Sequence, residues 1–374
     1  MHFHSLVAVR GFEIEKDPEG DERVAQLIRE AEEESKQNPD NLLMELRVRE
    51  LRGIENSFAR DISGEVDQIL APYSSEENEY TEREFEDMTE SLRNQYLNDT
   101  ADCIRLPGGK IVDAGSYPYY QKYVIQDGKV CERNAGPLHH AKRTRKTRKM
   151  KALPKLSLQK LYKNLDEYAT DGCGYTYDSD NDGYGCYYNP NSMWDWYVIG
   201  GRWPTTFLVK SDCAECASGE RSWGNDTEKY PCPEGYMWVS AARKKDIQWA
   251  AMLRWDIERA TESFHRYEKM FESQKLDDMP GCNLTERGIT HWGELIYRKG
   301  ETLEEFLKQC HCQDGQKYPV YFSDLISDED WQSSYGVEKS SSDANGHSTW
   351  ENMTEDFIDD LQDEDILVSV DYHM

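Results

Sequence analysis

Apolar residues recur at spacings of three and four between residues 245 and 273, which is the strongest periodic pattern in the chain. Trp249, Leu253, Ile257 and Phe264 belong to this series. An α-helix turns once every 3.6 residues, so this spacing gathers the apolar side chains into one stripe. We therefore predict a long helix over residues 245–273 that packs along one face.

Capping residues and chain breaks predict further helices. Thr81 and Thr302 are each followed three residues later by glutamate, the spacing of a capping box, in which two side chains satisfy backbone N–H groups of the first turn. These helices are predicted to end near residues 97 and 310. The charged stretch 17–59 predicts two more helices, separated by Asn-Pro-Asp-Asn at residues 38–41.

Short apolar runs at residues 4–9 (HSLVAV) and 366–372 (ILVSVDY) are typical of β-strands. Terminal strands are usually frayed unless they join a sheet. We therefore predict an α+β fold in which a mixed or antiparallel sheet includes the N- and C-terminal strands and is packed by helices. The predicted parts are an α+β core domain of residues 1–16 and 166–374, an acidic helical segment of residues 17–100, and an inserted strand and basic segment of residues 101–165.

The chain is strongly acidic, because 72 Asp and Glu against 44 Lys and Arg give a formal net charge of −28. This charge opposes direct binding to nucleic acid, whose phosphates attract Lys and Arg. Two roles remain for the acidic surface. It keeps the protein in solution, or it binds in the basic groove of a nucleic-acid-binding protein. Residues 139–155 are a basic exception, read as an insertion or exposed arm. One interpretation is that this segment binds RNA or an acidic partner. The interpretation that we favour is that it neutralises the protein's own acidic helices.

The first residues, MHFHSLVAVRGF, lack the basic region of a signal peptide, and no apolar run reaches the length of a membrane span. Ten cysteines without a secretory signal indicate a reducing compartment, where thiols are free or bound to metal. We expect a cytoplasmic protein that does not engage a membrane.

Residues 189–203, NPNSMWDWYVIGGRW, concentrate aromatic side chains around a Gly-Gly pair. Tryptophan combines a large apolar surface with one polar group, so such a cluster lines either a core or a recognition surface. Asp195 and Arg202 flank the predicted turn and can pair with each other or with a ligand. The candidate binding residues are Asn189, Asn191, Trp194, Asp195, Trp196, Arg202 and Trp203. The alternative is that the tryptophans pack on the helix that begins near residue 245.

Histidine and aspartate alternate with other residues in both terminal strands. His2 and His4 share one face of the first strand, and Asp371 and His373 share one face of the last. If the two strands are neighbours in suitable register, these side chains converge as a Zn²⁺ or Mn²⁺ site or as an acid–base pair. The alternative is that they are exposed strand ends. The candidate catalytic residues are His4, Asp195, Arg202 and His373.

Three cysteines match half of a zinc ribbon. Cys213 and Cys216 are separated by two residues, and Cys232 follows at a distance suited to a third ligand. The alternative is that these thiols act as small apolar side chains. Zinc is therefore one of the two cofactors that we consider.

Calcium is the other. Asp178, Asp180 and Asp182 precede a glycine, as in the first half of a calcium-binding loop. Asn189 stands where such a loop places its bidentate glutamate, however. The alternative, which we favour, is a polar turn that joins two strands into a hairpin.

The aromatic motif and the C-terminal strand together resemble a family of uncharacterised proteins of tailed bacteriophages and prophages. Those proteins carry a segment of the form NPxxKWDWYxIGGRW and end on a short strand with Asp-x-His. The matching residues here are Asn189, Pro190, Asn191, Trp194, Asp195, Trp196, Tyr197, Ile199, Gly200, Gly201, Arg202, Trp203, Asp371, Tyr372 and His373. Met193 replaces the usual lysine, so no role for a cation is expected there. The resemblance implies a phage or prophage origin and a host bacterial cytoplasm, without an assigned reaction.

These observations favour a phage accessory protein that binds a bacterial host protein through its acidic surface and inhibits a nucleic-acid-handling defence system. The alternative is an enzyme that processes nucleotides or nucleic acid, with or without a metal. Its tryptophans would stack on a base beside Asp195 and Arg202. Whether the chain is an enzyme is left open, and a role in binding is favoured.

Overall fold

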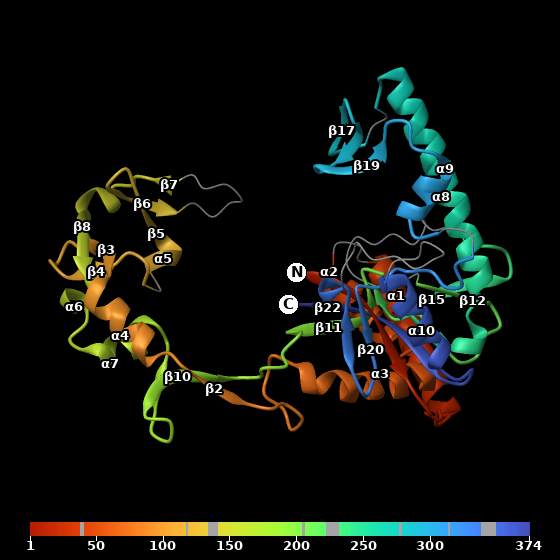
Figure 1. Cartoon of the computed structure of the whole chain (residues 1–374). Helices are drawn as coiled ribbons and strands as arrows, with labels where there is room; N and C mark the ends of the chain where they lie inside the picture. The colour runs from red at the N-terminus through yellow and green to blue at the C-terminus, as the bar shows by residue number, and fades with distance from the viewer. Residues whose placement is uncertain are drawn as a thin grey trace. The chain divides into compact units, whose positions relative to one another are not determined.

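The computed structural model describes residues 1–37, 41–116, 119–133, 141–203, 206–221, 232–276, 279–312, 315–337 and 349–374. Contacts within the chain divide it into two compact units, shown in Figure 1. Unit 1 comprises Met1–Thr81 and Met193–Met374, and unit 2 comprises Glu82–Ser192. All ten tryptophans come after residue 193 in the sequence, and the nine that the structure describes belong to unit 1.

The largest sheet of unit 1 is built around the two terminal strands. Its members are β1 (His2–Val9), β11 (Trp196–Gly201), β13 (Cys216–Ala217), β14 (Glu220–Arg221), β16 (Ala241–Arg243), β20 (Asp324–Ile326), β21 (Trp331–Ser333) and β22 (Ile366–His373). The strand order is β13-β16-β22-β1-β20-β21, and β11 pairs with β22 and β14. β1 and β22 are antiparallel, while β20 runs parallel to β1. The predicted α+β fold, with both terminal strands in one sheet, is confirmed.

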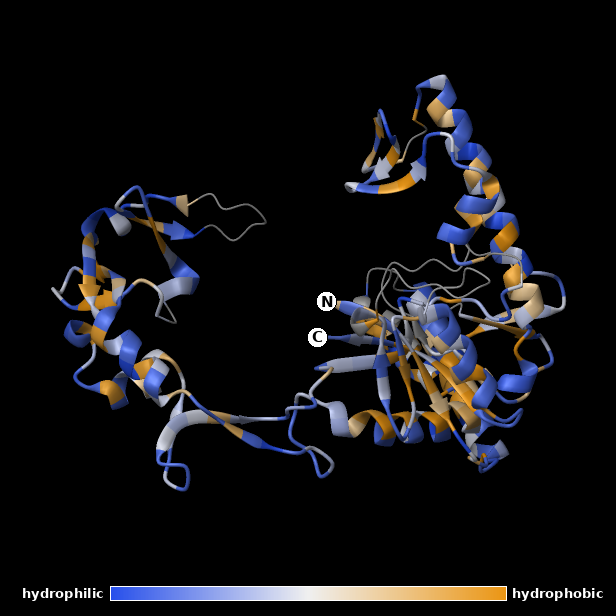
Figure 2. Ribbon diagram, viewed as in Figure 1, coloured by the Kyte–Doolittle hydropathy of each residue, from blue (hydrophilic) through white to orange (hydrophobic). Residues whose placement is uncertain are grey.

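Alternation along β1 and β22 gives the sheet two apolar faces. Leu6 and Leu367 point to one face, and Val7 and Val368 point to the other. The first face packs on a second layer formed by β12 (Phe207–Lys210), β15 (Tyr236–Val239) and α10 (Thr349–Asp360). The opposite face is covered by α3 (Ser57–Leu70). Figure 2 shows the hydrophobic residues gathered on the strands between these layers.

The helices after β1 differ from the prediction. The sequence predicts two helices over residues 17–59, and the structure has three: α1 (Pro18–Gln37), α2 (Leu42–Gly53) and α3. The third begins at its own cap, because the Asn56 side chain accepts a hydrogen bond from the N–H of Ala59. α3 buries its apolar face in the core of unit 1. Residues 17–81, about three quarters of the predicted acidic segment 17–100, fall in unit 1, and the rest fall in unit 2.

The long helix predicted over residues 245–273 is α8 (Trp249–Ser273), preceded by a 3-10 turn at Lys244–Asp246. Its N-terminal half packs on the sheet through Met252, and its C-terminal half packs through Phe264 on a small three-stranded sheet. The predicted capping box at Thr302 is present. The small three-stranded sheet consists of β17 (Cys282–Thr285), β18 (Gly288–His291) and β19 (Glu294–Arg298). The remaining elements of unit 1 are α9 (Leu303–Gln309) and the 3-10 turns Ala71–Tyr73 and Ser334–Gly336.

Unit 2 contains three small sheets, with strand orders β2-β10-β9, β4-β3-β8 and β5-β6-β7. The strands are β2 (Glu84–Asp87), β3 (Thr100–Arg105), β4 (Ile111–Asp113), β5 (Tyr123–Gln126), β6 (Lys129–Arg133), β7 (Ala141–Lys142), β8 (Lys151–Ser157), β9 (Thr176–Asp178) and β10 (Gly183–Tyr188). The helices are α4 (Thr89–Asn98), α5 (Tyr119–Lys122), α6 (Leu158–Leu161) and α7 (Leu165–Glu167), with short turns at Thr147–Lys149 and Tyr168–Gly172.

Two predictions for this part of the chain are wrong. The helix predicted from Thr81 begins only at Thr89, because Glu84–Asp87 pairs with β10 as a strand. Of the two alternatives for the basic segment 139–155, an insertion or an exposed arm, the exposed arm is wrong where the structure describes the segment. Its β8 pairs with β3, and the Lys146 ammonium lies 5.7 Å from the centre of the Tyr123 ring. Residues 139 and 140 lie outside the described residues.

Of the helices that the structure describes, none offers the apolar length that a membrane crossing requires.

Candidate functional site

The terminal strands bring four predicted site residues to one end of the sheet. Antiparallel pairing places His2 opposite His373 and His4 opposite Asp371, all on the face that carries Leu6. The two strands are therefore neighbours in the register that the prediction required, and His2, Asp371 and His373 come together, whereas the His4 side chain has other partners. Toward the middle of the sheet the same face is apolar core, so this end is a polar extension of that core.

Two histidine–carboxylate pairs form there. His2 Nδ1 lies 2.9 Å from Asp371 Oδ1, and His373 Nδ1 lies 2.8 Å and 3.0 Å from the two carboxylate oxygens of Asp195. The His373 imidazole lowers the pKa of the Asp195 carboxyl, chiefly through this hydrogen bond. The two imidazole centroids are 5.1 Å apart. The two pairs are therefore neighbours.

Trp196 holds the two imidazoles from the side. Its ring stacks on His373 with the centroids 6.0 Å apart and meets the edge of His2 at 5.2 Å. Trp196 is opposite His373 in the β11–β22 ladder, so its position follows from strand register. Trp196 is 41 % exposed, and the side chains of His2 and His373 are partly exposed beside it.

The Gly-Gly pair of the motif is required by the backbone at Asp371. Gly200 and Gly201 have φ values of +83° and +56°, which residues other than glycine rarely adopt. A Cβ at Gly201 would lie 2.4 Å from the Asp371 Cβ. This close approach lets the backbone N–H of Arg202 donate to Asp371 Oδ2 at 3.0 Å. Asp371 is thus fixed by both His2 and the turn.

His4 differs from the other two histidines because it is buried. Its Nε2 lies 2.9 Å from Ser369 Oγ, and its ring stacks on Trp203 with the centroids 4.4 Å apart. Burial lowers the pKa of His4 to about 3, so the imidazole is neutral at physiological pH. The catalytic role expected for His4 as an acid or base is not supported by this environment.

A cavity of about 260 Å³ opens beside His4. Its walls combine aromatic rings with charged side chains. It is lined by His4, Arg202, Trp203, Thr206, Trp238, Trp255, Asp256, Arg259 and Tyr321. Of the candidates predicted from the sequence, His4, Arg202 and Trp203 lie here, whereas His373 and Asp195 form the neighbouring pair at the sheet end.

The charged groups of the cavity are tied to its aromatic wall. The Arg259 guanidinium lies 4.4 Å from the centre of the Trp255 ring, and Trp255 packs 5.2 Å from Trp238. The Tyr321 hydroxyl donates to the carboxylate of Asp256. Burial raises the pKa of Asp256, against the opposing effects of this hydrogen bond and of Arg259. The cavity therefore offers stacking surfaces together with a cation and a carboxyl group.

The remaining motif residues have separate roles. Trp194 packs on the α3 side of the sheet, where its Nε1 donates to the carbonyl of Leu70 at 2.9 Å. The three tryptophans of the motif thus occupy three environments, and the alternative in which they all pack on the helix from residue 245 is wrong. Asn189 and Asn191 belong to unit 2, where the Asn189 side chain accepts from the N–H of Asn191 at 3.0 Å.

Within the described residues, no three His, Cys, Asp or Glu side chains are grouped so that they could hold a metal ion. The calcium candidates form the turn of the β9–β10 hairpin, which is the alternative that the sequence favoured. Asp178 Oδ1 accepts from the N–H groups of Asp180 and Asn181, and the Tyr177 hydroxyl donates to Asp182. The carboxylates of Asp178 and Asp182 are used inside the turn.

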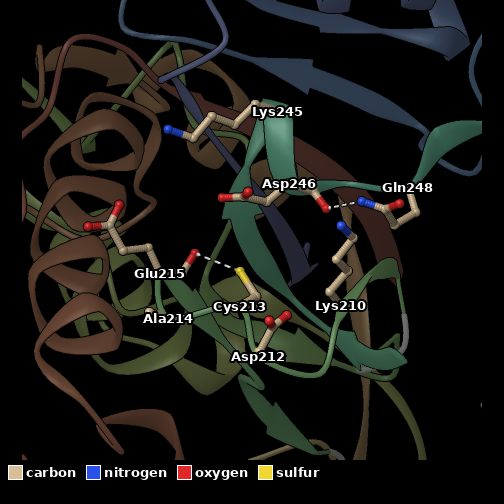
Figure 3. Close-up of a pocket in the computed structure, with 8 residues that line it drawn as sticks. All are labelled: Lys210, Asp212, Cys213, Ala214, Glu215, Lys245, Asp246 and Gln248. Carbon is tan, nitrogen blue, oxygen red and sulfur yellow. Dashed lines mark hydrogen bonds between the residues drawn. The ribbon is translucent and has the colours of Figure 1, made fainter. Parts of the chain in front are cut away.

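Two of the zinc candidates, Cys213 and Cys216, contact each other. Cys216 Sγ donates to the carbonyl of Cys213 at 3.4 Å, and burial raises the pKa values of both thiols. Cys213 lines a polar cavity of about 540 Å³ together with Lys210, Lys245 and three acidic residues, which Figure 3 labels. Cys232 is exposed and does not join a metal-binding group with them in the described structure.

Sequence reasoning missed the far wall of the cavity. Trp238, Trp255, Asp256, Arg259 and Tyr321 come from β15, α8 and the segment before β20. One signal was available on α8, because Trp255 lies off the apolar stripe that predicted the helix. A large ring on a different helical face indicates a second packing partner or a site.

Comparisons with family models, with curated proteins and with solved structures gave no match to this chain.

Proposed function

We propose that unit 1 binds a nucleotide or a related ligand with a heteroaromatic base in the cavity beside His4. The observation that carries this proposal is the combination of three tryptophans and a tyrosine with two arginines around one cavity. Aromatic side chains stack on bases of any sequence, and arginine binds phosphate through a planar, bidentate fork. The volume of about 260 Å³ suits a base rather than a larger molecule.

The polar groups give the ligand an orientation. Arg202 and Arg259 provide positive charge for a phosphate in a chain whose net charge is −28. Asp256 provides a buried carboxyl group that can accept from, or donate to, a ring nitrogen. A ligand with an aromatic base and an anionic group satisfies both sides of the cavity.

Tryptophan fluorescence tests the proposal directly, because the tryptophans that the structure describes all lie in unit 1. Purified protein is titrated with AMP, GMP, CMP and UMP, and binding is expected to quench emission to saturation. Trp255→Leu is expected to weaken binding about tenfold or more, since stacking on one ring contributes about 1–3 kcal/mol. Trp292→Leu is the matched control, because Trp292 is 78 % exposed and lies outside the cavity.

The result that would overturn the proposal is specific. If no nucleotide quenches the emission, the cavity is not a nucleotide site. The same follows if Trp255→Leu and Trp292→Leu bind equally well, because the quenching would then arise elsewhere.

A second candidate function, binding of a bacterial host protein by a phage accessory factor in the host cytoplasm, is favoured by the acidity of the surface. Glu30, Glu33 and Glu34 are exposed together on α1. Such a surface attracts a basic groove, more strongly at low salt than at high salt. A triple substitution of these residues to lysine is expected to abolish salt-sensitive capture of a bacterial protein. Capture that ignores both salt and the substitution would contradict this candidate.

A further inference from the structure

The two histidine–carboxylate pairs at the sheet end have the geometry of an acid–base pair. In both, Nδ1 is held by a carboxylate, which fixes the orientation of the ring. No described residue hydrogen-bonds Nε2 of either His2 or His373. Their side chains are 19 % and 33 % exposed, and their centroids are 5.1 Å apart. The two imidazole rings are therefore neighbours whose orientation is set through Nδ1, and Nε2 of each is left without a hydrogen-bond partner among the described residues.

We propose that His2 and His373 cleave a ribonucleotide phosphodiester by transfer to the substrate's own 2′-hydroxyl. This inference rests on the proposed function, because it names the substrate of the nucleotide cavity. One imidazole accepts the 2′-hydroxyl proton while the 2′-oxygen forms a bond to phosphorus. The other imidazolium donates a proton to the 5′-oxygen as the bond between phosphorus and that oxygen breaks. The products are a 2′,3′-cyclic phosphate and a free 5′-hydroxyl, so protons and bonds balance without an added reactant.

The cavity and the histidine pair are joined by Arg202. Its side chain lines the cavity, and its backbone N–H donates to Asp371, the partner of His2. His4, also in the cavity wall, lies two residues from His2 on the same strand face. Because a strand rises about 3.3 Å per residue, the two positions are about 7 Å apart. One nucleotide can span this distance, so the proposal places the base in the cavity and its adjoining phosphate at the histidine pair.

Asp371, Asp195 and Trp196 act as positioning residues. Each carboxylate accepts from Nδ1, which directs Nε2 outward and stabilises the imidazolium that forms during proton transfer. Asp371 is completely buried and also accepts from Arg202, so the orientation of His2 is set by the fold itself. Trp196 limits rotation of both rings by contact with each.

The test uses the full chain without a terminal tag, because β1 and β22 carry the two histidines. Dinucleoside monophosphates and their 2′-deoxy counterparts are incubated with the protein in EDTA, and products are separated by chromatography with mass detection. We expect 2′,3′-cyclic products from the ribose compounds alone. His2→Asn and His373→Asn keep a donor near the Nδ1 position but remove Nε2, and each is expected to lower the rate about a hundredfold or more.

A matched control is available elsewhere in unit 1. His311 Nδ1 also lies 2.8 Å from a carboxylate oxygen, that of Glu351, so His311→Asn removes a similar pair away from the site. It is expected to leave the cleavage rate unchanged. Equal losses in all three variants would indicate a general structural effect and would overturn the proposal.

The outcomes separate this inference from the proposed function. Nucleotide binding that Trp255→Leu weakens, without cleavage of any ribose compound, overturns the acid–base pair and leaves the cavity proposal standing. Cleavage that depends on both histidines but not on Trp255 leaves the acid–base pair standing and overturns the cavity as its base-binding site. Equal cleavage of the deoxy compounds rules out the 2′-hydroxyl, and the absence of both binding and cleavage overturns both proposals.

Discussion

Each face of the sheet carries a completely buried aspartate at the same end, Asp324 of β20 on one face and Asp371 of β22 on the other, and the two differ in their partners. On the α3 side, Asp324 accepts from the Tyr372 hydroxyl at 3.0 Å and from the Trp331 indole at 3.2 Å. On the other side, Asp371 accepts from His2 and from a backbone N–H. The donors to Asp324 are used up in the contact, whereas His2 keeps a second ring nitrogen.

Burial of a carboxylate is therefore a poor indicator of function by itself. A buried carboxylate needs hydrogen-bond donors wherever it lies. The two faces differ in whether the residue that donates to the aspartate has another hydrogen-bonding atom left for a ligand. Tyr372 and Trp331 close the core, and His2 opens toward solvent. The following predictions test whether one face is structural and the other is available for chemistry.

The largest effect is expected from the α3 side. Leu70→Ala removes a side chain that is 1 % exposed in this core and is expected to cost about 4 kcal/mol of unfolding free energy. This loss is measured by urea denaturation of the protein, with tryptophan fluorescence reporting the unfolding of unit 1. Leu43→Ala makes the same change at a residue that is 70 % exposed and should lie near wild type. Similar losses in the two variants would contradict the assignment of this face as core.

The turn at Asp371 is expected to be the next most sensitive. Gly201→Ala adds both a strained φ and a clash with Asp371, and is expected to cost about 3 kcal/mol. Gly11→Ala has a similar φ, +60°, with nothing within 4 Å, so it isolates the cost of conformation at about 1 kcal/mol. The difference between the two in the same denaturation experiment measures the close approach. If the two variants lose the same amount of unfolding free energy, the contact with Asp371 does not contribute to stability.

His4 predicts a pH dependence. Its pKa is about 3 in the folded chain and near 6.5 when unfolded, so between these values the unfolded state binds a proton that the folded state does not. Stability is therefore lost as pH falls below about 6.5. The loss attributable to His4 reaches about 1.4 kcal/mol by pH 5.5, as calculated from this linkage. Unfolding is therefore measured at a pH well above 6.5 and again at pH 5.5, and the loss of stability between them should be smaller for His4→Gln than for the wild type. His265→Gln, at an exposed histidine, should keep the wild-type dependence.

The smallest effect on stability is expected at His373. Its carboxylate partner is half-exposed, and solvent screens such pairs. His373→Asn should therefore leave the thermal unfolding midpoint of unit 1 unchanged within measurement error. A clear fall in the midpoint would show that the histidine face is structural as well, and would remove the contrast between the two faces.

The sequence predicted which residues meet at the end of the sheet, but it did not predict the cavity beside His4. Alternation in the two terminal runs predicted that His2, His4, Asp371 and His373 share faces, because a strand's side-chain period is two whatever its partners. The separate environment of His4 depends on Trp203 and Ser369 packing around it, which no local pattern encodes.

The missed elements have a related cause. The capping box at Thr81 was overridden because Glu84–Asp87 pairs with a strand about a hundred residues away. The wall of Trp238, Trp255 and Tyr321 depends on how three distant segments meet. Local propensity and periodicity describe neighbours in sequence, so contacts between distant segments lie outside what they predict.

The central place of β22 also has a consequence for the order in which unit 1 folds. β22 pairs with β1, β11 and β16, and the contact between His2 and Asp371 joins residues 369 positions apart. Until β22 is in place, these three strands lack their shared neighbour and the apolar face of α3 has no complete surface to cover. Pairing over such sequence distances is slow, and it leaves apolar segments exposed while the chain is incomplete. The local hairpins β3–β4 and β5–β6 have no such delay, so unit 2 is expected to acquire structure while unit 1 still waits for its final strand.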